Sequence, residues 1–349
     1  MYSNLAIGGV VVLFFTGFFG PGGSLYYRPL SQVMLGFGLS HAAGAAQVLI
    51  SGASIATACY HWAWQHCHPE EPVRILGLYL MLILPANLAG DIAGAYLADL
   101  VPELFQLIVL AALCACASLI LFRRAVKTAE AEQSGSQIAM FKPHLEISHF
   151  KLLIYYAVIF ITYALFIFIR GNSYLKSIAG IKMCSGIYWI VTAAEFVALF
   201  VTAWLNCPQR DRFLIGIALV EGALVNMVGI PVGSIMKPVL ITFTSVAPVQ
   251  ASATTSMLVA CISTSKALGY LISGSTPLDT LIFSIFTFTG CLVGLTSIQV
   301  YLVDKVRRSI LQYFMTLIFS LGGCFIFAVD MMNYVNGIAT GVISSQLVC

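Results

Sequence analysis

Two short stretches of the chain combine helix-breaking residues with a cation, and they occupy matching places in its two halves. Residues 20–30 read GPGGSLYYRPL, and residues 229–239 read GIPVGSIMKPV. Arg28 and Lys237 are 237 − 28 = 209 residues apart, and a proline follows each of them. Interrupted hydrophobic segments at corresponding positions of two halves indicate the binding site of a transporter. A cation beside each interruption favours an anion as the cargo.

The chemistry of an interrupted helix also suits an anion. The N–H groups at the start of the half-helix that follows each break carry partial positive charge, and Arg suits oxyanions through its planar fork of donors. We therefore predict a cradle for sulfonate, sulfite or carboxylate groups. The predicted substrate-binding residues are Gly22, Gly23, Ser24, Arg28, Gly233, Ser234, Lys237, Thr254, Thr255 and Ser256.

Other roles for these side chains stay open. Arg28 and Lys237 could instead extend to a membrane interface or neutralise a buried acid. The hydroxyls of residues 254–256 could bond to their own helix backbone, as helix hydroxyls commonly do.

Composition places the chain in lipid. Of its 349 residues 60% are hydrophobic and 9% are charged, with a mean hydropathy of +0.94, whereas soluble domains carry roughly a quarter charged residues. The net charge of +3 comes with no basic tail, so nucleic acid is not an expected partner. No phosphate-binding loop or metal-ligand motif is present, so we expect no cofactor and no metal.

The apolar segments predict an all-α polytopic membrane protein built from two tandem repeats. Each repeat contains a broken or re-entrant helix pair, and two extra spans join the repeats. The predicted boundaries are 1–122 for the first repeat, 123–212 for a cytoplasmic loop with the two linking spans, and 213–349 for the second repeat. The Gly90-x-x-x-Gly94 spacing recurs 200 residues later at Gly290 and Gly294, which suits close helix packing.

The basic residues favour opposite orientations for the two repeats. If each broken pair returns to its starting side, most Lys and Arg residues fall in cytoplasmic loops, as the positive-inside rule requires. The parallel arrangement divides them more evenly. The chain has no Lys or Arg before Arg28, so we expect its first helix to be retained rather than cleaved as a signal peptide.

Several polar residues fall outside this pattern. Asp91, Glu195, Glu221 and Lys266 lie within apolar segments, where an ionisable group is costly unless it is paired or functional. Glu221 could pair with Lys237 or carry a proton. The loop that holds His61, His66 and Cys67 has metal-ligand residue types without a structural zinc spacing, and we interpret it as a solvated turn.

The glycine-rich break, the Pro29-Leu30 pair and the small-residue helix start at 251–256 together resemble the sulfite exporter TauE/SafE family of anion permeases. Ser265-Lys266-Ala267-Leu268-Gly269-Tyr270 continues the resemblance. It covers nearly the whole chain except 123–150, although Pro21 and Ser24 depart from the family's glycines. The resemblance implies transport of small sulfur-containing or organic anions across the plasma (inner) membrane.

Residues and resemblance together predict a secondary transporter, not an enzyme, located in the cell membrane. Its expected partners are a small anionic substrate and the lipid bilayer, and a homodimer stays open. The alternatives are an anion channel, or a membrane-embedded enzyme with His61, His66 and Cys67 at its site. Substrate identity, direction of flux and coupling ion are left open at this stage.

Overall fold

The fold is helical throughout the part of the chain described by this computed structural model. The described residues are 24–35, 39–70, 73–134, 154–155, 157–159, 161, 186–207, 211–228, 233–244, 246–272, 276, 278–298 and 308–340. The helices are α2 (Ser24–Leu35), α3 (Leu39–Cys67), α4 (Gly77–Leu100), α5 (Glu103–Gln133), α8 (Gly186–Leu205), α9 (Arg212–Val228), α10 (Gly233–Phe243), α11 (Pro248–Ile272), α12 (Thr280–Ile298) and α13 (Arg308–Thr340). The predicted all-α class is confirmed.

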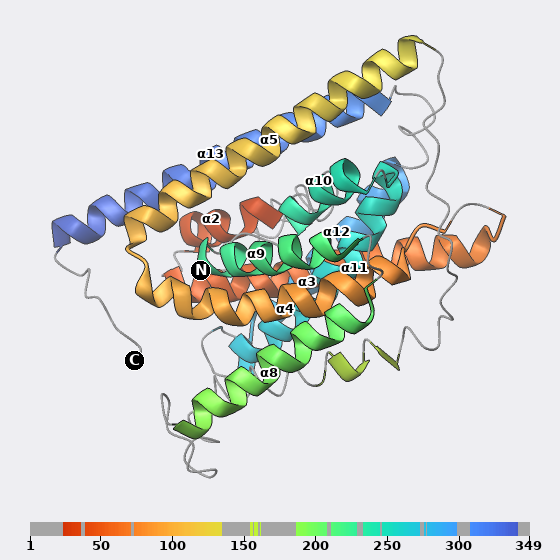
Figure 1. Cartoon of the computed structure of the whole chain (residues 1–349). Coiled ribbons are helices and arrows are strands. Elements are labelled where there is room, and N and C mark those ends of the chain that lie inside the picture. The colour runs from red at the N-terminus through yellow and green to blue at the C-terminus, as the bar shows by residue number, and fades with distance from the viewer. Residues whose placement is uncertain are drawn as a thin grey trace.

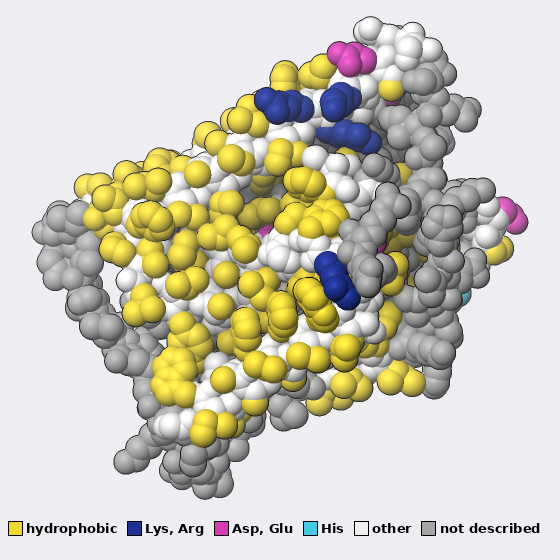
Figure 2. All heavy atoms as spheres, in the orientation of Figure 1, with side chains coloured by type: hydrophobic (Ala, Val, Ile, Leu, Met, Phe, Trp, Pro, Cys, Tyr) yellow, Lys and Arg dark blue, Asp and Glu magenta, His cyan; other side chains and the backbone are white. Residues whose placement is uncertain are grey.

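Within the described residues, four helices are long and apolar enough to cross a membrane. These stretches are Gly77–Gly94, Glu103–Gln133, Thr280–Ser297 and Gln312–Asn336. Large apolar side chains are exposed along α5, α8, α12 and α13, and they cover most of the face in Figure 2. An exterior of this kind is suited to lipid, which agrees with a multi-pass membrane protein.

The helices form a body flanked by two outer elements (Figure 1). α5 and α13 lie side by side along one edge, and α8 lies at the other edge against α4. α2 packs between α3 and α13, while α10 packs against α9, α11 and α5. The two short helices that follow the sequence breaks therefore both lie between the α5–α13 pair and the body.

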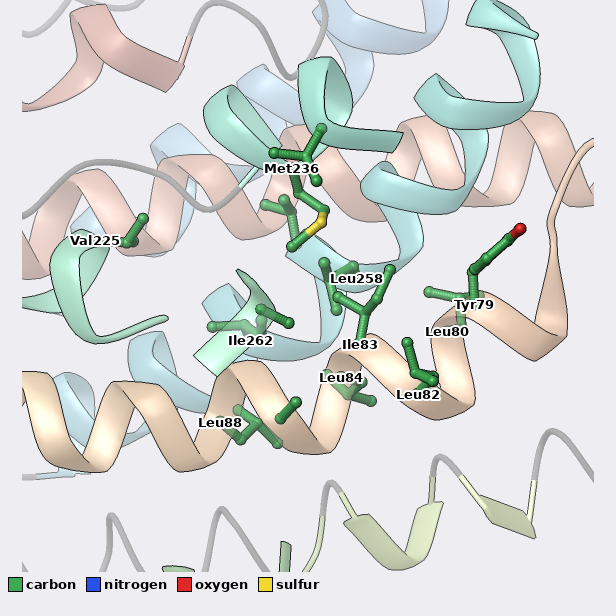
Figure 3. Packing of buried hydrophobic residues seen from close by; sticks show 14 of the residues in the cluster. Tyr79, Leu80, Leu82, Ile83, Leu84, Leu88, Val225, Met236, Leu258 and Ile262 are labelled. Carbon is green, nitrogen blue, oxygen red and sulfur yellow. The ribbon is translucent and has the colours of Figure 1, made fainter. Parts of the chain in front are cut away.

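The largest hydrophobic core surrounds α4 (Figure 3). Leu80, Ile83 and Leu84 of α4 are almost fully buried, and they pack with Met236 of α10 and Leu258 of α11. A second core joins α2, α5 and α13, and it includes Tyr26, Leu110 and Ile318. Because each core draws on elements from both ends of the chain, the two predicted repeats do not fold as separate bodies.

α5 extends beyond the predicted boundary at residue 122. Residues 123–133 are rich in Arg, Lys, Glu and Ala, which favour helix even where the segment is polar. Glu132 accepts hydrogen bonds from Ser309 Oγ at 2.6 Å and from Ser309 N at 3.2 Å, so its carboxylate caps the start of α13. The boundaries of the three predicted domains stay predictions.

α3 and α11 occupy the interior of the bundle. Both are rich in Ala, Ser and Thr, and most of these small side chains are buried. Ser54 Oγ of α3 lies 3.3 Å from Ser263 Oγ of α11. Gly44 approaches Tyr270, so positions rise along α3 as they fall along α11, and the two helices run antiparallel.

α4 and α9 approach each other through glycine. A Cβ on Gly90 would meet the carbonyl oxygen of Leu219, and one on Gly94 would meet that of Ala223. A Cβ on Gly222 would likewise meet the carbonyl oxygen of Asn87. Gly90 and Gly94 therefore serve the close packing that their spacing predicts.

Two further helix pairs make corresponding contacts. Thr57 Oγ1 of α3 lies 3.1 Å from Cys291 Sγ of α12, and Lys266 of α11 pairs with Asp91 of α4. Lys266 follows Thr57 by 209 residues, and Cys291 follows Asp91 by 200 residues. These are the offsets that relate the two sequence breaks and the two Gly-x-x-x-Gly stretches.

Candidate functional site

Lys237 lies one turn after the start of α10, at the second sequence break. α9 ends at Val228 and α10 begins at Gly233, as the sequence predicts. The Nζ atom of Lys237 lies 3.4 Å from Ser252 Oγ on α11. Among the described residues Lys237 forms no ion pair, so its positive charge is not neutralised by a carboxylate within that part of the chain.

A buried histidine lies within electrostatic range of Lys237 and of one further basic side chain. His61 on α3 is 7% exposed, Arg74 before α4 is 8% exposed, and His61 lies within electrostatic range of both Arg74 and Lys237. The Nδ1 atom of His61 is buried without a hydrogen-bond partner within the described residues. We call His61, Arg74 and Lys237 the basic cluster.

The segment that carries Arg74 is fixed against the start of α11. Gln250 Nε2 donates to the carbonyl oxygen of Val73 at 2.8 Å, and Leu76 N donates to Thr254 Oγ1 at 3.0 Å. The guanidinium of Arg74 also lies over the Trp64 ring, 4.3 Å from its centroid. These contacts hold Arg74 between the end of α3 and the start of α11, so its position in the basic cluster is fixed by the fold.

Basic side chains that gather in an interior place attract a negative charge. A charge removed from water is costly unless a counter-charge or hydrogen bonds compensate it, and an anion would compensate Lys237, which forms no ion pair among the described residues. Lys, Arg and imidazole supply only donors when protonated, which suits an oxyanion such as sulfite or a sulfonate. Ser252 adds a hydroxyl to the same place.

Arg28 has a different environment. Its Nη2 atom lies 3.3 Å from Asp330 Oδ1 on α13, and the side chains are 15% and 7% exposed. This ion pair corresponds to the second role considered for Arg28, the neutralisation of a buried acid. The two cations that match in sequence thus have different partners, a carboxylate for Arg28 and a hydroxyl for Lys237.

The predicted hydroxyls bond mainly to the protein itself. Thr255 Oγ1 donates to the carbonyl of Ala251 at 2.7 Å, and Ser256 Oγ donates to that of Ser252 at 2.7 Å. Thr254 instead receives the hydrogen bond from Leu76 N and supports the segment next to Arg74.

The remaining predicted residues surround the helix starts. Ser24 begins α2 and Gly233 begins α10, so both half-helices start where the sequence predicts. Gly22 and Gly23 lie outside the described residues, as do the side chains of Ser24 and Ser234.

The predicted solvated turn is helical as far as Cys67, and the prediction is wrong for His61, which lies inside α3. His61 is buried, whereas His66 and Cys67 are exposed, and His66 Nδ1 lies 2.9 Å from the carbonyl oxygen of Trp62. Among the described residues, no group of three His, Cys, Asp or Glu side chains could hold a metal ion.

The sequence alone does not reveal that His61 lies near both Arg74 and Lys237. The sequence suggests only a solvated turn for the segment that holds His61, and it gives Arg74 no place in a site. The contacts of Val73 and Leu76 with α11 bring Arg74 into place, and these span 177 and 178 residues of sequence. No local pattern encodes a contact of that range.

The interior acids also have defined partners. Glu221 Oε2 accepts a hydrogen bond from Asn87 Nδ2 at 2.8 Å, and it does not form the ion pair with Lys237 that the sequence left open. Asp91 forms its ion pair with Lys266, and its backbone carbonyl accepts from Asn226 Nδ2 at 2.7 Å.

A helical bundle with a lipid-suited exterior, an interior of small polar residues and a buried basic cluster defines this chain as a multi-pass membrane protein. It is 26% identical over 194 residues to sulfite exporter TauE/SafE family protein 2 of Arabidopsis thaliana, across 47% of this chain and 42% of that relative. Family protein 1 is 25% identical over 198 residues, covering 49% and 44%, and family protein 5 is 28% identical over 195 residues, covering 49% and 42%.

These similarities support membership of the chain in the sulfite exporter TauE/SafE family and confirm the resemblance seen in its motifs. The matched region spans less than half the length of each of these curated relatives. No family model matches the chain, and no solved structure matches it.

Proposed function

We propose that this protein is a secondary transporter of small anions in the cell membrane, and that the basic cluster binds the anion. The observation that carries the proposal is that buried His61 lies within electrostatic range of both Arg74 and Lys237, with Lys237 in no ion pair among the described residues. The relatives are named as sulfite exporters, so sulfite, sulfonates and related sulfur-containing or organic anions are the first substrates to test.

The proposed transport uses two inverted repeats. Support comes from the contacts Thr57–Cys291 and Asp91–Lys266, which are related by the repeat offsets. Further support is that the equivalent helices α3 and α11 run antiparallel where they touch. α5 and α13 also run antiparallel, as positions 122 and 132 contact positions 313 and 309. Equivalent helices that meet antiparallel suit an axis in the membrane plane.

In this proposal the helix starts at Ser24 and Gly233 complete the anion cradle with their backbone N–H groups. Arg28 and the hydroxyls of residues 254–256 act mainly as supports, because their contacts are already directed to protein groups. Homodimer formation is not required for this mechanism, since all three members of the basic cluster belong to one chain.

Anion binding to the purified full chain tests the proposal. Lys237→Ala removes one charge-assisted hydrogen bond, which contributes about 1.5–3 kcal/mol, so affinity should fall roughly ten- to a hundred-fold. Lys127→Ala is the matched control, because Lys127 is an exposed cation near the end of α5, and it should bind like the unaltered protein. Unchanged affinity after Lys237→Ala would contradict the assignment of the site.

Flux measurements in proteoliposomes separate the transporter from its alternatives. A transporter should show counterflow, in which unlabelled sulfite inside drives uptake of labelled sulfite. A channel should conduct without counterflow. If the protein is instead an enzyme that uses His61, His66 and Cys67, their combined replacement should abolish its turnover. Such a protein should show no flux of any anion before or after the replacement.

A further inference from the structure

The interior of the body holds polar side chains that anion binding at the basic cluster does not use. They come from α4, α9 and α11, and we call them the interior polar group: Asn87, Asp91, Glu221, Asn226 and Lys266. Asn87 and Asp91 are one turn apart on α4, with Glu221 bonded to the first and Lys266 paired with the second. Asn226 Oδ1 lies 3.4 Å from Lys266 Nζ, which closes the group.

This group lies in apolar surroundings. Asn87 is fully buried, Glu221 is 3% exposed and Asp91 is 4% exposed, and the largest hydrophobic core surrounds them. Ionisable groups in such a place are costly in a membrane protein, and they are usually associated with ion or proton pathways.

The fold itself does not require charge at this position. The corresponding contact in the other half is made by Thr57 and Cys291, which are uncharged. Asn87 likewise corresponds to Thr287, which donates to the carbonyl of Leu49 at 3.0 Å. At these positions one set of helices, α3 and α12, packs through hydroxyl and thiol groups. The corresponding helices, α11 and α4, hold an ion pair, and Glu221 of α9 adds a carboxyl. This difference indicates a function beyond packing.

Glu221 is the member best placed to exchange a proton. It forms no ion pair with any described residue, its Oε2 has a single side-chain donor, and its Oε1 has no hydrogen-bond partner within the described residues. Asp91, in contrast, is neutralised by Lys266. A carboxyl with one free oxygen and no counter-charge can accept a proton there without losing its bond from Asn87.

Glu221 also contacts the helix that carries the anion site. The backbone N–H of Met236 interacts with the Glu221 carboxyl, and Met236 directly precedes Lys237. A negative charge on Glu221 opposes a second negative charge bound beside Lys237. A proton on Glu221 removes this opposition, so proton and anion binding favour each other, and by linkage the effect is reciprocal.

The charged groups around Glu221 are few. α9 packs against α4, α5, α8 and α10. The Asp, Glu, Lys and Arg residues on these neighbours are Asp91 and Asp99 on α4, Glu195 on α8, Lys237 on α10, and on α5 Glu103 at its start and the charged residues of its 123–133 end. Lys266 of α11 reaches the group through Asp91. α5 meets α9 with apolar side chains, among them Leu107 and Leu110 near Met227.

We propose that Glu221 is the proton-binding group of a proton–anion cotransporter, an inference that rests on the proposed anion transport. A proton from water on one side adds to Oε1, which forms an O–H bond and cancels the charge of the carboxylate. After the transporter reopens to the other side, that bond breaks and the proton returns to water with the release of the anion.

The pH dependence of anion affinity tests this inference. The probe is ethanesulfonate, because it stays fully ionised between about pH 6 and about pH 8. Any change of affinity in this range therefore comes from protonation of the protein and not of the ligand. Affinity of the full chain should rise at least about fivefold from the upper to the lower pH, the range of a typical coupling free energy. Glu221→Gln imitates the protonated form and should bind tightly at both pH values.

Glu195→Gln is the matched control, because Glu195 is another carboxyl on an apolar helix but lies outside the interior polar group. It should keep the pH dependence of the unaltered protein. In proteoliposomes, Glu221→Gln should keep counterflow and lose accumulation driven by a pH gradient. Survival of the pH dependence or of gradient-driven accumulation in Glu221→Gln overturns the inference.

A readout without any anion separates this inference from the proposed function. Infrared spectra of the purified protein should contain a carbonyl band from a protonated carboxyl that is lost in Glu221→Gln, and this band should be distinct from any band that is lost in Glu195→Gln. If this band is absent, the proton is not held there and the inference fails, whatever the transport data show. If the band is present but no anion binds, the proposed transport fails and the coupling fails with it.

Discussion

Ser54 Oγ and Ser263 Oγ lie 3.3 Å apart across the contact of α3 and α11, and these two serines are 209 residues apart in sequence. The same interval separates Arg28 from Lys237. In a pair of repeats related by a two-fold axis, a residue touches its own counterpart only where the axis passes. In the proposed inverted arrangement, the two-fold axis that relates the repeats would therefore pass near the Ser54–Ser263 contact.

We expect cysteines introduced at positions 54 and 263 to form a disulfide under mild oxidation. The variant Ser54→Cys with Ser263→Cys is made in a background without native cysteines, with a protease site inserted between residues 134 and 154. Non-reducing gels should then show the two fragments still linked after cleavage. Ser54→Cys with Ser265→Cys is the control, because Ser265 lies on another face of α11 and bonds to the carbonyl of Cys261. Equal linkage in both variants would contradict the contact.

Gly222→Ala should destabilise the protein strongly, because its Cβ would meet the carbonyl oxygen of Asn87 on the neighbouring helix. Overpacking of this kind typically costs about 1–3 kcal/mol. Gly216→Ala on the same helix is the control, since nothing lies within 4 Å of its Cβ position. It should be neutral or stabilise by roughly 0.5–1 kcal/mol through better helix propensity. Thermal unfolding of the detergent-purified protein measures both, and equal melting temperatures would refute the close approach.

Lys266→Thr should be more harmful than the double variant Asp91→Cys with Lys266→Thr. The single change leaves Asp91 buried without its cation, which typically costs about 3–5 kcal/mol. The double change installs the uncharged residue types of the Thr57–Cys291 contact in the other half. Recovery of most of the lost stability in the double variant is the expected result, again by thermal unfolding. A double variant as unstable as the single one would show that the two contacts are not equivalent.

Arg28 and Lys237 should respond differently to removal. Arg28→Ala leaves Asp330 without its cation and should lower stability, and Asp330→Asn in the same chain should restore much of it. Lys237→Ala should weaken anion binding with little loss of stability. Melting temperature and anion affinity, measured on the same preparations, distinguish these effects. A loss of affinity in Arg28→Ala that Asp330→Asn does not reverse would place Arg28 in the anion site after all.

Single cysteines at positions 134 and 304 should both be labelled from the cytoplasmic side. Ser134 is exposed just after α5, and position 304 lies outside the described residues. The inverted arrangement places both on one side of the membrane. An impermeant thiol reagent applied to right-side-out and inside-out vesicles checks this, and external labelling of position 304 alone would favour parallel repeats.

Local sequence signals predicted the helix starts well. Glycine and proline at the second break end α9 before residue 229, and α10 begins at Gly233 because helix formation can resume there. The spacing of Gly90 and Gly94 likewise predicted close packing, since only a missing side chain permits such an approach. Both features depend on neighbouring residues alone.

Interactions between distant elements were not predictable in this way. The basic cluster exists because the end of α3, the segment before α4 and α10 all meet near the start of α11. Similarly, the sequence left Glu221 with two candidate roles, and only the approach of α4 to α9 shows that Asn87 is its partner. A single sequence carries no sign of which distant polar residues meet.

The glycine contact of α4 and α9 has a mechanical consequence. Two helices whose backbones touch have no side-chain rotamers between them to rearrange, and a small slide along their axes would force a carbonyl oxygen into a Cα. The two helices should therefore move together as one rigid body. Any change that opens the protein to one side of the membrane must therefore bend or tilt at contacts other than the one between α4 and α9.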